Sequence, residues 1–170
     1  MKKLIPFFIF GLLLISQLPL NGFCQEPLVA LIKSSPNDQS SLSDRILKEI
    51  SKYIGTPYKK GGSSGSGVDC SGFARLIYRK IFNVDLPYIA SNQARLGIFQ
   101  EISLEQLSTG DLIFFTATPE KKRINHVGIY LINGEFVHSI EKGGVDIASL
   151  SDPHWKVRVK TIKRIKDLPD

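Results

Sequence analysis

Apolar residues recur at helical spacing in the first half of the chain. Between residues 42 and 54 an apolar stripe follows Ser41, which can cap a helix together with Asp44 three positions further on. A second stripe begins where a glycine-rich segment ends at Cys70 and continues through Ile81. The pattern predicts three helices, over residues 42–54, 70–81 and 90–96.

The second half of the chain changes to short apolar runs and alternation, which is typical of strands. Residues 112–115 form one such run, and residues 126–132 and 135–140 flank Asn133-Gly134, a strong hairpin signal. Further strands are expected over 145–148 and 157–162, with a charged loop over 119–125. Helices followed by strands predict an α+β fold, with N-terminal helices packed on a C-terminal antiparallel β-sheet.

The first residues have the pattern of an export signal. Met1-Lys2-Lys3 leads into an almost wholly apolar run up to Leu20, so residues 1–24 are predicted to be a signal peptide. The alternative is an uncleaved N-terminal anchor. Residues 25–42 contain prolines and little apolar periodicity, which indicates a linker or N-terminal arm. Residues 43–170 then form the single expected domain.

Cleavage before Gln25 would remove Cys24, because small residues flank Phe23 as in an A-x-A-like site. The alternative is a lipoprotein that keeps Cys24 as a lipid anchor, although the bulky Phe23 argues against it. After the favoured cleavage the mature chain holds one cysteine, Cys70. An unpaired cysteine in an exported protein is a candidate reactive thiol.

Composition fits one globular domain: the chain has 170 residues, 42% of them hydrophobic, and a formal net charge of +6. Loss of Lys2 and Lys3 with the signal leaves a net charge of +4. Six basic residues gather near the C-terminus, where they could attract anionic polymers or simply form a solvated strand face. An exported chain is not expected to bind nucleic acid, and the oligomeric state is left open.

Cys70 stands where the glycine-rich residues 61–67 meet a predicted helix. Unpaired amides and the helix dipole at such a position favour a thiolate, which is the nucleophilic form of cysteine. The small residues before it leave room for a substrate. The alternative is a cysteine that serves only as a small buried apolar residue.

Two histidines lie on the predicted hairpin, His126 at its start and His138 on its second strand. A thiolate needs an imidazole to carry its proton and a polar group to orient that imidazole, so His126 is the expected base and His138 its partner. If Ile132 pairs with Glu135, however, the two histidines lie on opposite faces. Meeting at one site then requires a bulge or twist near the start of the first strand, or a His126 that lies just before the regular pairing begins.

A zinc site formed by Cys70, His126 and His138 is the competing interpretation. It lacks a C-x-x-C pair and an obvious fourth ligand, so neither a metal nor another cofactor is expected. His154, in a polar loop beside Trp155, is not expected to be catalytic.

Several motifs, taken in order, closely resemble the NlpC-type family of bacterial cell-wall cysteine peptidases. The resemblance covers the chain from about residue 43 onward and implies a papain-like α+β fold. It also implies hydrolysis of peptidoglycan stem peptides, typically between γ-linked D-glutamate and a diamino acid. The motifs are Gly55-Thr56-Pro57-Tyr58, Gly61-Gly62, Asp69-Cys70-Ser71-Gly72-Phe73, Leu86-Pro87, Gly110-Asp111-Leu112-Ile113-Phe114-Phe115 and His126-Val127-Gly128-Ile129-Tyr130.

By position, the resemblance implies that Cys70 is the nucleophile, His126 the base and His138 the third polar residue. It further implies that Tyr58 helps to bind the developing oxyanion. Asp69 and Ser71 match positions that contact the stem peptide. One departure is Tyr88, which stands where many members carry an arginine.

The sequence therefore predicts an exported peptidoglycan endopeptidase of the periplasm, envelope or medium, working through a thioester acyl-enzyme. A catalytically silent wall-binding module on the same scaffold is one alternative. An amidase or acyltransferase that uses the same three residues is another.

Overall fold

The computed structural model describes residues 40 to 166, so the predicted signal peptide, Cys24 and most of the expected arm lie outside the described residues. Helix α1 (Leu42–Ser51) begins as expected, because Ser41 and Asp44 form a capping box in which the Asp44 amide donates to the Ser41 hydroxyl at 3.2 Å. It ends three residues before the predicted boundary. Within residues 40–166 no helix is long and apolar enough to cross a membrane.

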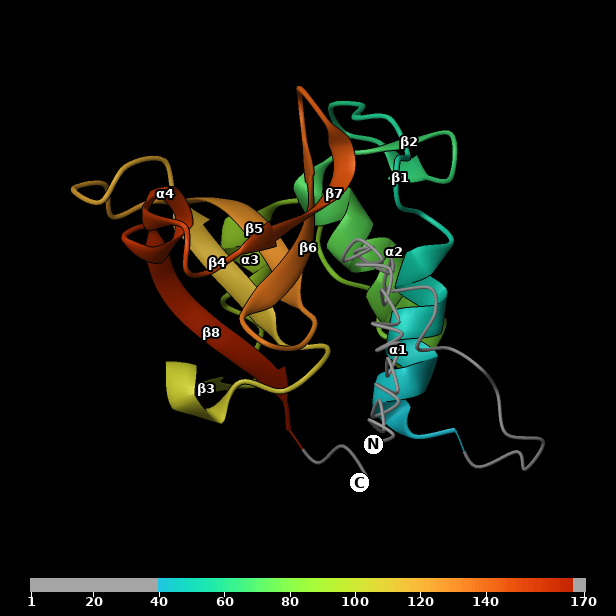
Figure 1. Ribbon diagram of the computed structural model, residues 1–170, viewed down its shortest axis with the longest axis horizontal. Helices are drawn as coiled ribbons and strands as arrows, with labels where there is room; N and C mark the ends of the chain where they lie inside the picture. The colour runs from blue at the N-terminus through green and yellow to red at the C-terminus, as the bar shows by residue number, and fades with distance from the viewer. Residues whose placement is uncertain (1–39, 167–170) are drawn as a thin grey trace, which may run out of the picture. The chain divides into compact units, whose positions relative to one another are not determined.

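Helix α2 (Cys70–Phe82) is the central helix, and it confirms that Cys70 begins a helix. Its apolar face packs against α1 and against the sheet (Figure 1). The buried Tyr78 donates from its hydroxyl to the carbonyl of Gly110 at 2.7 Å. Asn83 ends the helix in the left-handed conformation, with φ of 55°.

Six antiparallel strands form one sheet in the order β3-β8-β4-β5-β6-β7. This confirms the predicted α+β architecture with an antiparallel sheet. A separate two-stranded hairpin, β1 (Ser63–Ser64) and β2 (Gly67–Val68), lies in the glycine-rich segment. The strands of the large sheet are β3 (Phe99–Ile102), β4 (Leu112–Thr116), β5 (Ile124–Tyr130), β6 (Glu135–Ile140), β7 (Gly144–Ser149) and β8 (Val159–Ile165).

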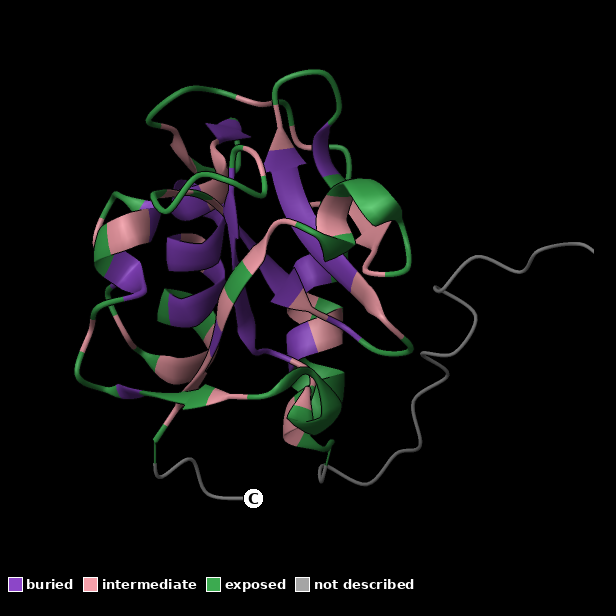
Figure 2. Cartoon of the chain, turned by 90° about the vertical axis from the view of Figure 1, so that its left-hand side faces the viewer, coloured by how far each residue is buried: buried purple, intermediate pink, exposed green. Residues whose placement is uncertain are grey.

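Both faces of the sheet are covered by apolar side chains. One face packs on the helices through residues such as Phe114 and Val127, and the other holds a second cluster that includes Phe115 and Phe136. All five residues of β4 are buried, which explains the continuous apolar run over residues 112–115 (Figure 2).

The differences from the predicted elements are local. Helix α3 (Ala90–Gln93) is shorter than the predicted 90–96, and a 3₁₀ turn (Leu104–Gln106) follows β3. Strand β3 was not predicted, because it is four residues long and pairs with β8 at the far end of the chain. The last strand, predicted over 157–162, begins two residues later as β8. It follows helix α4 (Pro153–Lys156), which was not predicted and is capped by Asp152.

Candidate active site

Cys70 is the first residue of α2, and the glycine-rich segment packs closely against this turn. The Asp69 amide donates to the carbonyl of Gly62 at 3.0 Å. A Cβ atom added to Gly72 would collide with the same carbonyl oxygen. The absence of a side chain at Gly72 therefore lets the loop rest directly on the helix turn that carries the cysteine.

Asp69 and Ser71 are used to hold this turn together. The Asp69 carboxylate accepts from the Gly72 amide at 2.7 Å, the Gly61 amide at 2.8 Å and the Ser71 hydroxyl at 2.9 Å. The buried Ser71 hydroxyl also lies 2.8 Å from the carbonyl of Tyr88. These contacts give both residues a structural role beside the substrate contacts that the resemblance implies.

The expected thiolate at the helix start is not the favoured form of Cys70. Burial, together with the neighbouring Asp69 charge, raises the pKa of the thiol to about 11. Hydrogen bonds to the sulfur from the amides of Val127, Ser71 and Cys70 oppose this rise without overcoming it. The amides at the helix start stabilise the thiolate, but the desolvation of a charged sulfur in this buried site has a larger effect on the pKa. The thiol therefore has to lose its proton during a reaction.

The contact with the Val127 amide places the sulfur against β5, directly beside His126 in the chain. Thus α2 and β5 bring together two segments that are more than fifty residues apart in the sequence.

The predicted hairpin register was wrong by one residue. Ile129 pairs with Val137 and Tyr130 with Phe136, whereas an Ile132–Glu135 pair would place Ile129 opposite His138. The Leu131 amide donates to the carbonyl of Glu135 at 2.9 Å, and the Glu135 amide donates to the carbonyl of Ile132 at 2.9 Å. Leu131 and Ile132 therefore both stand opposite Glu135, which is a β-bulge.

This bulge lies beside the turn. An irregularity also occurs near the start of β5, as expected, where Phe115 pairs with His126 but Thr116 pairs with Ile124. That irregularity lies before His126, so it does not alter the register between β5 and β6. Because side chains alternate between faces, a shift of one residue moves His138 to the face that carries His126. The Nε2 atom of His126 lies 2.9 Å from the Nδ1 atom of His138. This hydrogen bond fixes the His126 ring and leaves its Nδ1 atom for another partner.

Burial keeps both imidazoles neutral. It lowers the pKa of His126 to about 3, with a smaller contribution from His138, and lowers the pKa of His138 to about 4 although the Asp146 charge opposes it. At neutral pH a neutral His126 can accept a proton. A neutral thiol together with two neutral imidazoles is therefore the resting state that these pKa values favour.

Trp155 covers the imidazole pair and was not singled out by sequence reasoning. Its ring stacks on His126 with centroids 5.4 Å apart and planes at 28°, and it meets His138 edge-on at 4.7 Å. Phe115 and Phe136 also contact the pair. The aromatic cover accounts for the desolvation of the two rings. A single tryptophan in a polar segment carries no periodic signal that could have revealed it.

Tyr58 lies on the loop next to β2 and pairs with Val68 in a parallel bridge. Burial raises the pKa of its phenol, with further contributions from Cys70 and Asp69. The phenol therefore stays protonated at neutral pH and can donate a hydrogen bond close to the sulfur.

Tyr88, the departure from the resembled pattern, is 62% exposed. Its ring lies over the guanidinium group of Arg75, with 4.2 Å between the Arg75 Cζ atom and the ring centroid. Arg75 is buried and binds Asp85 at 2.7 Å and the Leu86 carbonyl at 2.8 Å, so its charge holds the loop after α2.

His154, which was not expected to be catalytic, is exposed, with its Nε2 atom 2.5 Å from the Nη1 atom of Arg158. Its ring contacts the aromatic cover, with its centroid 4.9 Å from that of Trp155. Among residues 40–166, no group of three or more histidine, cysteine or acidic side chains is arranged to hold a metal ion.

Comparisons with known proteins identify the family of the chain. The family model described as the NlpC/P60 family matches residues 55–164. The MepS murein DD-endopeptidase/murein LD-carboxypeptidase of Escherichia coli K12 is 36% identical over 124 residues, which is 73% of this chain and 63% of that protein. The gamma-DL-glutamyl hydrolase of Bacillus subtilis 168 is 33% identical, over 77% of this chain and 31% of that protein.

Solved structures show the same fold. An NlpC/P60 family protein from Bacillus cereus ATCC 10987 superposes with a TM-score of 0.66 at 31% identity, over 72% of this chain and 40% of that chain. The matched region thus spans less than two thirds of the MepS protein and of the B. cereus chain. From the family model, the identities and the shared papain-like α+β fold, we conclude that this chain belongs to the NlpC/P60 family.

Proposed function

We propose that the protein is an exported cysteine endopeptidase that cleaves peptide bonds in peptidoglycan stem peptides. Cys70 is the nucleophile, His126 the base and His138 the residue that orients the base. The proposal depends above all on the direct hydrogen bond between the two imidazoles, 2.9 Å long, next to the strand residue whose amide contacts the Cys70 sulfur.

In this reaction the Cys70 sulfur attacks the scissile carbonyl carbon while its proton passes to His126. The tetrahedral intermediate collapses to a thioester when His126 gives the proton to the departing amine. Water, deprotonated by His126, then attacks the thioester, releases the carboxylic acid and restores the thiol. The Tyr58 phenol donates to the oxyanion that forms in both steps.

The choice of bond is part of the proposal. We place the cleaved bond between D-glutamate, linked through its γ-carboxyl, and the diamino acid. Two relatives point to different bonds, since one is named a gamma-DL-glutamyl hydrolase and the other a DD-endopeptidase and LD-carboxypeptidase. Asp69 and Ser71, which fix the turn before and after Cys70, hold the stem peptide at the nucleophile.

The test is digestion of defined stem peptides, including a cross-linked dimer, with products identified by mass spectrometry. Cleavage at the γ-glutamyl bond is expected. Cys70→Ala and Cys70→Ser should each lower the rate by at least about a thousandfold with an unchanged circular dichroism spectrum. Cleavage of the D,D cross-link would reassign the bond, and full activity of either variant would rule out the thioester route.

Two alternatives give distinct results in the same experiment. A catalytically silent wall-binding module would sediment with insoluble peptidoglycan and release no soluble product. An amidase or acyltransferase would act on a different amide, or transfer the acyl group to an acceptor other than water. Export itself, and any lipid on Cys24, are read from the mass of the mature protein isolated from cells.

A further inference from the structure

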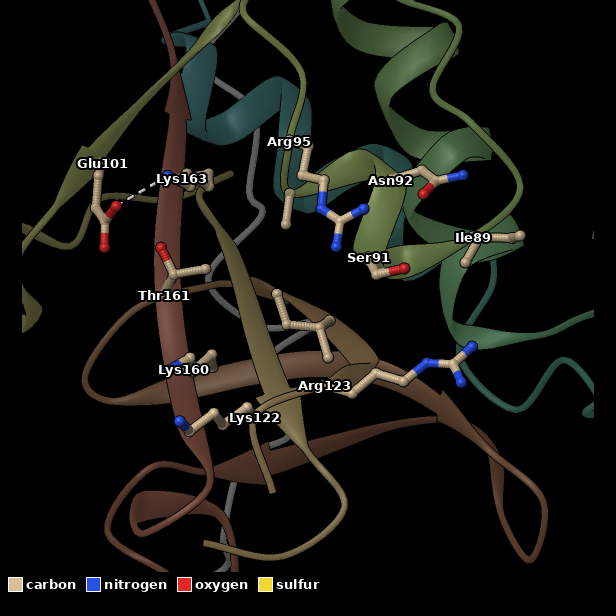
Figure 3. Close-up of a pocket in the computed structure, with 12 residues that line it drawn as sticks. Ile89, Ser91, Asn92, Arg95, Glu101, Lys122, Arg123, Lys160, Thr161 and Lys163 are labelled. Atoms are coloured by element: carbon tan, nitrogen blue, oxygen red, sulfur yellow. Dashed lines mark hydrogen bonds and ion pairs between the residues drawn. The ribbon is translucent and has the colours of Figure 1, made fainter. Parts of the chain in front are cut away.

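A basic groove of about 780 Å³ lies between α3, the segment that leads into β5, and strands β3 and β8 (Figure 3). Its polar side chains are predominantly cationic, and Glu101 is the one acidic residue among those lining it. The cations are Arg95, Lys122, Arg123, Lys160 and Lys163.

Most of this positive charge has no partner among the described residues. Lys163 donates to Glu101 at 3.0 Å, and this contact lowers the pKa of the Glu101 carboxyl. No other cation of the groove lies within 4.0 Å of a carboxylate in the part of the chain between residues 40 and 166. A concave surface with several unpaired like charges attracts an anionic ligand.

Two elements connect the groove to the candidate active site. Arg123 directly precedes β5, whose third residue is His126. On the other side, the buried Gln93 of α3 donates from its Nε2 atom to the carbonyls of Ser71 at 2.9 Å and Pro87 at 2.8 Å. The helix that forms one wall is therefore tied to the turn that carries Cys70.

We propose that the basic groove binds free carboxylate groups of the peptide substrate, an inference that rests on the proposed function. Arg95 and Arg123 extend from opposite walls, with Ser91 of α3 between them in the view (Figure 3). A guanidinium group can hold a carboxylate through two parallel hydrogen bonds. Ile89 and Ile124 add apolar surface, which suits a peptide better than a polymer of phosphodiesters.

The test compares two stem peptides that differ only in having a free carboxylate or a carboxamide beyond the cleaved bond. Binding is measured by calorimetry on the Cys70→Ala protein, so that no hydrolysis occurs. The carboxylate peptide should bind about tenfold more tightly, a difference of about 1.4 kcal/mol. Arg95→Gln combined with Arg123→Gln should remove this preference, whereas Arg45→Gln on the exposed surface of α1 should retain it.

Equal binding of the two peptides by the unsubstituted groove would overturn the proposal. So would tight binding of poly(glycerol phosphate) that depends on the two arginines while the peptides are not distinguished. With Cys70 intact, the double variant should show a KM about tenfold higher for the carboxylate peptide and an unchanged kcat. Absence of hydrolysis in the parent protein would refute the proposed function alone, because the binding difference is measured separately.

Discussion

At the scale of single residues, the surroundings of the candidate site favour the uncharged forms of its side chains. Cys70, His126 and His138 all carry pKa values moved toward the neutral form, to about 11, about 3 and about 4. The expectation of a ready-made thiolate considered the amides at the helix start but not the burial of the sulfur. Protein packing around the site, which the sequence does not reveal residue by residue, decides this balance.

Alkylation of Cys70 tests this state. The rate with iodoacetamide should rise continuously from pH 6 to pH 10, because the thiolate fraction grows tenfold per pH unit below a pKa of about 11. The same chain unfolded in urea provides the control, with a thiol pKa of about 8.5. A rate that levels off between pH 4 and pH 6 would reveal a thiolate–imidazolium pair in the free protein and contradict the neutral state.

Trp155 should act as a positioning residue for the imidazoles that it covers. Trp155→Ala admits water, so the pKa of His126 should rise by more than one unit toward the ordinary value of about 6.5. Trp155→Phe preserves an aromatic cover and should preserve most of the shift. Histidine titrations by NMR measure both, and an unchanged pKa in the alanine variant would show that other groups desolvate the ring.

At the scale of elements, the β5–β6 hairpin decides whether the two histidines meet. The Asn133-Gly134 signal correctly predicted the turn, and both residues have positive φ, of 54° and 80°. The Asn133-Gly134 pair does not predict the bulge at Leu131–Ile132. This bulge sets the register and hence the face of the sheet on which His138 lies. Turn chemistry is local, whereas register also depends on which side chains the core accepts.

Deletion of Ile132 should be tolerated. Ile132 is 45% exposed, and its removal leaves Leu131 opposite Glu135 across a two-residue Asn-Gly turn without changing the pairing of Tyr130 with Phe136. The variant should remain folded and retain more than about half of the parent activity. Gly134→Val, at the same turn, should instead cost about 1–2 kcal/mol of unfolding free energy because of its positive φ.

Thermal melting and peptide hydrolysis compare these two variants with the parent. Loss of activity in a folded Ile132 deletion would mean that the bulge itself, and not only the register, positions His138.

At the scale of the whole molecule, the sequence was sufficient for the α+β class, the order of the main elements and the positions of Cys70 and His126. It was insufficient for β3, whose partner Ile165 lies 66 residues after Phe99, and for the cover by Trp155. Both β3 and Trp155 lie in short segments that are stabilised by distant parts of the chain. Local periodicity carries no information about such partners.

The buried histidine pair should make stability depend on pH. Both folded-state pKa values lie below the unfolded value of about 6.5, so the unfolded chain binds protons first as the pH falls. The stabilisation is complete above about pH 6.5 and decreases as the pH falls toward the folded values near 4 and 3. At pH 5 the unfolding free energy should be lower by on the order of 2 to 4 kcal/mol.

Urea unfolding at pH 7.5, 6 and 5 measures this decrease. The His126→Gln/His138→Gln variant keeps every carboxylate and should show a much flatter dependence. Equal slopes in the two proteins would assign the effect to acidic groups and not to the imidazoles.

Gln93 links events at the groove to events at the sulfur. Because its side-chain amide donates to the carbonyl of Ser71, next to the nucleophile, and to that of Pro87, α3 cannot shift alone when a ligand occupies the groove. Binding of a ligand in the groove should therefore displace α3 and the turn that carries Cys70 together, by a small amount. The part of a peptide at Cys70 and the part in the groove would then affect the same turn. A fragment that fills only one of these two places would be hydrolysed more slowly than its affinity suggests.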